Sequence, residues 1–333
     1  MTSLISDLNR VVVSPNFPLE WRDVDDFLGE FGPFNGRYVP RYPNDWVEKL
    51  RHHVADIDSQ KLPPLERAAL FERLRRELAL CTTPVSWVWD DSKSWGSNVQ
   101  TVLNAIREAK VVGDALDPSP FENWSRLAAD IKRSRFRSWA FHGLVSEYAH
   151  QCSPLLLNSP AAYMIDPFLD PFAEACENLL LCFFDLIKGS KCYRVDLITR
   201  QSACGGRERS EPKTWMKESE IQDSLNRIYR QRVPKDRSLL VHLVQEAPPH
   251  QEGLLMHDRF FMTMHGAINF GQGFMKVSQK QPMQNAFVVD KDHHAILKEM
   301  YINGVARFSE KLPKKTNTPY PKYVSTFVVN AIN

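Results

Sequence analysis

The feature that most constrains the fold is a buried strand followed by a well-marked helix start, near residue 160. Residues 161–165 are uncharged and have the length of a buried strand, and residues 172–187 carry apolar side chains at helical spacing. Between them, Asp170 and Pro171 stand where a helix needs an N-cap and a first-turn proline. A strand that leads directly into a helix predicts a βα unit.

The same alternation continues to about residue 305. We expect further strands at 193–199, 239–244 and 286–289, and further helices at 219–230 and 290–303. Strands separated by helices of this length are typical of an α/β fold with a mostly parallel sheet flanked by helices. Another apolar stretch, 323–329, has strand character, but the pattern gives it no place in the sheet.

The first 155 residues have a different character, rich in Trp and Pro and dominated by helical patterns. Helices are expected at 65–81, at 98–110 and at 121–150, the last broken near Ser138. The pattern around the tryptophans at 87, 89, 95, 124 and 139 indicates packing in a core rather than a platform for stacked bases. The expected organisation is a mainly helical N-terminal domain (1–155), an α/β domain (156–308) and a C-terminal tail with a short strand (309–333).

One motif in the α/β part points to a chemistry. His257-Asp258-Arg259 lies in an expected strand, a turn follows at His265-Gly266, and a second short strand ends in Asn269-Phe270-Gly271-Gln272-Gly273. Side chains alternate along a strand, so His257 and Arg259 should project from the same side. An imidazole beside a cation suits binding or attack at a phosphate oxygen. The candidate catalytic residues are His257, Arg259 and Asn269.

Over residues 160–305, this order of elements resembles one half of a phospholipase D-like domain. In active members, His-x-Lys is followed after four residues by Asp, then after six by Gly-Ser, with Asn two residues later. His257 and Gly271 match this signature, and Arg259 takes the place of the lysine. The Asp, Ser and Asn positions hold Met264, Gln272 and Phe274.

The pattern is more similar to the degenerate phospholipase D-like module that follows MIT domains in eukaryotic membrane-remodelling proteins, and to uncharacterised bacterial proteins that carry it. This resemblance implies a mixed sheet flanked by helices that binds phosphate groups or lipid headgroups rather than cleaving them. The first 155 residues do not resemble an MIT helical hairpin.

In active members a histidine forms a phosphohistidine, and a second histidine protonates the leaving group. With one motif in the chain, the resemblance implies that such a site would need a homodimer. The imidazole also needs a carboxylate partner. Asp258 faces the other side of its strand, so Asp166, Glu246 and Asp290, from other strand ends, are the alternatives.

Other basic residues are candidates for phosphate contacts. Arg200 lies at the carboxyl end of an expected strand, where open α/β sheets place ligands, and Arg207 and Arg209 lie in the Gly-Gly loop that follows. Gly271 and Gln272 complete the expected phosphate-binding set. A basic cluster interleaved with aromatic residues is the candidate nucleic-acid contact, with a solvated helix face as the alternative: Lys132, Arg133, Arg135 and Arg137.

Charge and cysteine content exclude several classes of protein. Lys and Arg total 42 against 40 for Asp and Glu, so any phosphate affinity must be local. The 6 cysteines show no CxxC spacing, which indicates reduced core residues rather than a zinc site or a disulfide scaffold. His293-His294 beside Asp290 is explained by helix capping. We expect no metal, no cofactor, no transmembrane segment and a cytoplasmic location.

Together with these observations, the resemblance implies a phospholipase D-like protein that recognises a phosphodiester, is directed at nucleic acid and has weak or absent His257-dependent cleavage. By resemblance alone, it would belong to a bacterial genome-defence system. One alternative is a homodimeric nuclease or phosphodiesterase that works through a phosphohistidine. The other is a protein that binds anionic lipid or acts as a scaffold or adaptor for protein partners.

Overall fold

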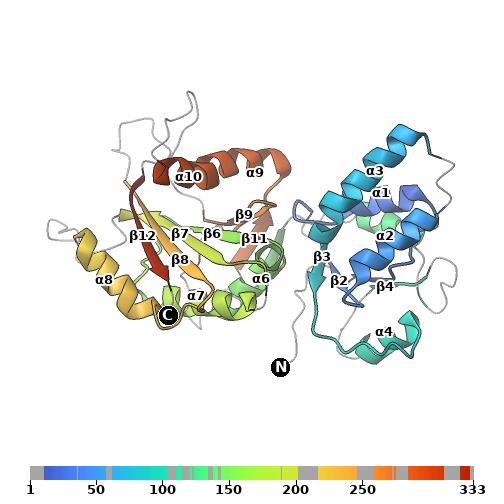
Figure 1. Cartoon of the computed structure of the whole chain (residues 1–333), viewed down its shortest axis with the longest axis horizontal. Coiled ribbons are helices and arrows are strands. Elements are labelled where there is room, and N and C mark those ends of the chain that lie inside the picture. Colours follow the sequence, from blue (N-terminus) through green and yellow to red (C-terminus); the bar gives the residue numbers. More distant parts are fainter. Residues whose placement is uncertain are drawn as a thin grey trace. The chain divides into compact units, whose positions relative to one another are not determined.

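The chain folds into two compact units, Met1–Arg137 and Ser138–Asn333 (Figure 1). The boundary expected after residue 155 therefore falls inside the second unit. The computed structural model describes residues 11–35, 37–57, 62–103, 110–114, 121, 124–133, 138–141, 144–188, 190–201, 217–245, 259–271, 274, 284–310 and 323–330.

The first unit joins its helices through short parallel strands. Its helices are α1 (Trp21–Glu30), α2 (Trp46–Asp56), α3 (Pro64–Glu77), α4 (Trp95–Leu103) and α5 (Trp124–Arg133), and a 3-10 turn (Leu78–Cys81) follows α3. Its strands are β1 (Val11–Val13), which pairs with β4 (Lys110–Val112), and β2 (Val39–Arg41), which pairs with β3 (Thr82–Pro84). Helices therefore form most of the described part of this unit, and two pairs of short parallel strands accompany them.

Two short strands were misread from the sequence in this unit. β3 follows directly after the helix expected at 65–81, and β4 begins at Lys110, the last residue of the helix expected at 98–110. The core of the unit is aromatic. Phe27 contacts Phe17, Trp46 and Trp124 at ring-centroid distances of 5.3, 5.8 and 5.8 Å, so core packing is confirmed for Trp124.

The second unit contains a mixed sheet of eight strands in its described residues, in the order β12-β8-β7-β6-β9-β10-β11-β5. The bounds in chain order are β5 (Ser138–Phe141), β6 (Ala161–Ile165), β7 (Arg194–Arg200), β8 (Ser238–Val244), β9 (Phe260–Thr263), β10 (Ala267–Asn269), β11 (Gln284–Val288) and β12 (Tyr323–Asn330). Among the neighbouring strands of this sheet that the structure describes, only β6 with β7 and β7 with β8 pair in parallel. The expectation of a mostly parallel sheet was wrong, because antiparallel strands extend it on both sides.

The two edge strands explain the remaining errors in the expected domain limits. The break expected near Ser138 is confirmed, but it is a strand, β5, that pairs with β11 and brings the following helix into this unit. β12, expected in a separate tail, pairs along its length with β8. Its side chains Phe327 and Val329 lie in the core, so the strand belongs to the domain.

Helices cover both faces of the sheet (Figure 1). One face carries α6 (Val145–Leu157), α7 (Glu174–Ile187) and α8 (Glu218–Tyr229), and the other carries α9 (Lys291–Leu297), a π-helical segment (Lys298–Asn303) and α10 (Gly304–Ser309). The Asp290 carboxylate accepts a hydrogen bond from the backbone N–H of His293 at 2.9 Å, so the predicted cap is confirmed. Among the described helices, none has the length and apolar character that crossing a membrane requires.

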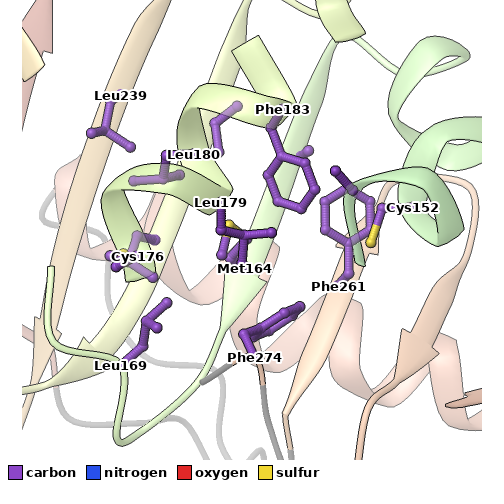
Figure 2. Packing of buried hydrophobic residues seen from close by; sticks show 14 of the residues in the cluster. Cys152, Met164, Leu169, Cys176, Leu179, Leu180, Phe183, Leu239, Phe261 and Phe274 are labelled. Carbon is purple, nitrogen blue, oxygen red and sulfur yellow. The ribbon is translucent and has the colours of Figure 1, made fainter. Parts of the chain in front are cut away.

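The larger core lies between the sheet and α6 to α8 (Figure 2). Met164 of β6, Phe261 of β9 and Phe183 of α7 meet there, and the rings of Phe183 and Phe261 lie 5.3 Å apart. Cys152 and Cys176 are buried in the same core, and burial raises the pKa of the Cys152 thiol. Free core cysteines are therefore confirmed within the described residues.

Truncation of Phe261 to Ala should lower the free energy of unfolding by about 3–5 kcal/mol, because it leaves a cavity at the centre of this core. Phe287→Ala, at a Phe that is 45% exposed on β11, is the matched control and should change stability little. Urea unfolding measures both. Equal effects would contradict the assignment of this core.

Candidate functional site

Three strands bring polar residues to one edge of the second unit's sheet, the edge formed by the carboxyl ends of β6 and β7. Ile165, the last residue of β6, pairs with Ile198 of β7 and with Phe260, the first residue of β9. The residues just outside β6 and β9, Asp166 and Arg259, therefore face each other. Arg200 ends β7 at the same edge. Carboxyl ends of parallel strands are where open α/β sheets place ligands.

Asp166 holds this edge together from a position that is 1% exposed. Its Oδ1 accepts a hydrogen bond from the backbone N–H of Phe168 at 2.9 Å, and its Oδ2 accepts one from Phe274 at 3.3 Å. Its own backbone N–H donates to the carbonyl of Ile198. Burial raises the pKa of the Asp166 carboxyl, and the two backbone donors and Arg259 only partly offset this effect.

The guanidinium group of Arg259 is fixed from two sides. Nε lies 3.6 Å from Asp166 Oδ1, and Nη1 donates a hydrogen bond to the carbonyl oxygen of Gly271 at 2.7 Å. The side chain is 21% exposed, so it remains within reach of solvent. Such a planar fork, held in place and still accessible, suits an anionic oxygen.

The turn after β10 delivers the Gly271 carbonyl to Arg259. Asn269 pairs with Phe260 across the hairpin, and the Oδ1 of Asn269 accepts the backbone N–H of Gly271 at 2.7 Å. Gly271 has φ +46°, in the left-handed region that favours glycine. In the structure, Asn269 therefore shapes the turn that positions Arg259.

An exposed aromatic ring lies between the arginines of this edge. Phe168 is 53% exposed, and its ring centroid lies 4.9 Å from the guanidinium carbon of Arg200 and 5.1 Å from that of Arg259. Cations attract aromatic faces at such distances. The ring thus joins residues of β7 and β9 across the end of β6.

Behind the polar edge lies a wall of buried aromatic side chains. Tyr148 of α6 packs against Phe270 and Phe274, with ring centroids 5.2 and 5.7 Å away. Burial, with a smaller contribution from the Asp166 charge, raises the pKa of Tyr148 to about 12. This wall keeps water from the inner side of Asp166.

Several expected site residues are not placed. His257, Gln272, Arg207, Arg209, Arg135 and Arg137 lie outside the described residues, as do Asp258 and Glu246. Lys132 and Arg133 end α5, and nothing is described of their side chains. Asp290 follows β11 at the opposite edge of the sheet, so among the alternative carboxylates only Asp166 is seen beside Arg259.

Phe168, Tyr148 and Phe274 were not singled out as members of the site from the sequence. Their aromatic character hides such a role, and only Asp166-Pro167, directly after the uncharged strand at 161–165, marks the place in the sequence. A separate buried polar cluster was also missed. His242 Nδ1 lies 2.9 Å from Thr326 Oγ1, and its Nε2 lies 3.7 Å from the carboxylate of Asp196 in the middle of the sheet.

Neither the protein-family models nor the curated proteins gave a match to this chain. Among solved structures, the chain is similar to phosphatidylserine synthase from Haemophilus influenzae Rd KW20, at 14% identity and a TM-score of 0.34, over 55% of this chain and 40% of that one. It is also similar to TrmBL2, an archaeal chromatin protein whose structure shows a novel mode of DNA binding, at 12% identity and a TM-score of 0.26, over 82% and 83% of the two chains. TM-scores this low establish no shared fold, so the site is interpreted from its own geometry.

Replacement of Asp166 by Asn should lower the free energy of unfolding by about 1–3 kcal/mol, because an amide cannot accept both backbone N–H groups. Asp185→Asn is the control, since Asp185 is exposed and pairs only with Lys188 in the described part of the chain. Urea unfolding compares the two. Wild-type stability in Asp166→Asn would contradict the assigned role.

The same variant tests the pKa of Asp166. Because the pKa is raised above its ordinary value of 3.8, the folded protein holds this proton more tightly than the unfolded chain. The stability that this bound proton contributes to the wild type is fully present below pH 3.8 and is lost as the pH rises through the raised pKa. The stability difference should therefore move in favour of Asp166→Asn between about pH 3 and pH 7. A constant difference in urea unfolding would refute this direction.

Proposed function

We propose that the second unit recognises the phosphate groups of nucleic acid at the edge formed by Asp166, Arg200 and Arg259, as a phospholipase D-like module that binds rather than cleaves. The observation that carries this proposal is the fixed guanidinium group of Arg259, held between the Asp166 carboxylate and the Gly271 carbonyl. Arg200 supplies a second cation on the same aromatic ring.

The charge of this edge favours an anion. The two guanidinium groups of Arg200 and Arg259 lie at one aromatic ring, beside the single carboxylate of Asp166. Within the part of the chain that the structure describes, Arg259 contacts Asp166 through Nε and Gly271 through Nη1, so Nη2 can point to a ligand oxygen. Charged hydrogen bonds of this kind give phosphate contacts their strength and their dependence on salt.

The contacts that Asp166 makes in the structure support binding without turnover. A nucleophilic imidazole at position 257 would need a carboxylate to hold its tautomer. Asp166 lies beside Arg259, but its oxygens accept two backbone N–H groups and pair with Arg259. The position of the family's aspartate holds Met264, which lies in the turn at the far end of β9.

Arg259→Ala and Arg200→Ala should each weaken binding of a fluorescent single-stranded oligonucleotide about tenfold or more, because each removes a charged phosphate contact. Each should also lower the slope of log affinity against log salt by about 0.7. Fluorescence anisotropy measures both quantities. The control is Arg230→Ala. Arg230 is exposed and follows α8, in the segment that connects this helix to the start of β8 at the opposite edge of the sheet.

Unchanged affinity in both arginine variants would contradict the proposal. Cleavage of the oligonucleotide by the wild-type protein that is lost in His257→Ala would identify a phosphodiesterase instead. A gel of the recovered oligonucleotide separates these results.

A further inference from the structure

Phe168 is held on the surface by rigid backbone contacts on both sides. Its own N–H donates to Asp166 Oδ1, and the next residue, Leu169, is fully buried. The backbone N–H of Leu169 donates to the Asp166 carbonyl, and the Leu169 carbonyl accepts the Thr199 hydroxyl at 2.9 Å. The exposed ring therefore has little freedom to fold back into the core.

The exposure of the Phe168 ring gives up the stability that its burial would provide, and the packing of the core does not explain this exposure. Burying a Phe side chain normally stabilises a protein, and the neighbouring Leu169 is buried completely. Phe168 instead stands out at the ligand edge, with the guanidinium groups of Arg200 and Arg259 within 5.1 Å of its centre. An exposed aromatic ring and two cations are thus presented together.

Resting on the proposed phosphate site, we infer that Phe168 stacks a nucleobase, so that the edge takes single-stranded nucleic acid. The arginines hold the backbone phosphate, and the ring takes the base beside it. Aromatic side chains next to a cationic groove bind unpaired bases of any sequence. A duplex keeps its bases stacked inside, and a lipid phosphate has no planar group for the ring.

The test compares two ligands that differ only in their bases. The full-length protein is titrated with a fluorescent oligothymidylate and with an abasic oligonucleotide of the same length, which keeps the phosphates. Wild type should bind oligothymidylate more tightly. Phe168→Leu should weaken oligothymidylate about tenfold and leave the abasic ligand unchanged, and Phe168→Trp should retain binding. Phe287→Leu, at an exposed Phe of β11, should change neither affinity.

Other results overturn the inference in distinguishable ways. If wild type binds both ligands equally, or if Phe168→Leu weakens both equally or neither, the ring takes no base while the phosphate site stands. If wild type binds neither ligand at low salt, the proposed function fails with it. Binding only to vesicles of phosphatidylserine and phosphatidylcholine would assign the site to lipid headgroups.

Discussion

The buried carboxylate of Asp166 is where three segments distant in the sequence meet. It follows β6, accepts the backbone N–H of Phe274 from the segment after β10, and pairs with Arg259 at the start of β9. A buried charge is tolerated only when hydrogen bonds and an opposite charge compensate it. The same contacts that compensate Asp166 fix the guanidinium group and the exposed Phe168. Stability and the candidate ligand site therefore depend on one group.

The placement of the site follows from the mixed topology of the sheet. Parallel β6 and β7 end at one edge, and the antiparallel hairpin of β9 and β10 begins and ends at that same edge. A wholly parallel sheet would reach Arg259 only through another crossover helix. The hairpin instead returns Gly271 to the start of β9 within one turn, so donor and acceptor come from neighbouring strands.

The sequence predicted the elements whose signals are local. The strand at 161–165 and the helices α7 and α8 have clear apolar periodicity, and Arg200 was expected at a strand end. The pairing partners of β5 and β12 were not predicted, because antiparallel pairing between segments far apart in the sequence leaves no local pattern. The exposure of Phe168 beside Arg200 and Arg259 was not predicted for a related reason. The sequence around an aromatic residue beside a buried strand does not show whether its side chain points into the core or into solvent.

The geometry of the β9–β10 hairpin also limits how the gene can vary. Asn269 lies opposite Phe260, and this register brings Gly271 within 2.7 Å of the Arg259 side chain. An inserted residue within a strand of this hairpin would shift its register by a step and turn the inward side chains that follow it outward. The number of residues in the strands of this hairpin should therefore vary little during evolution.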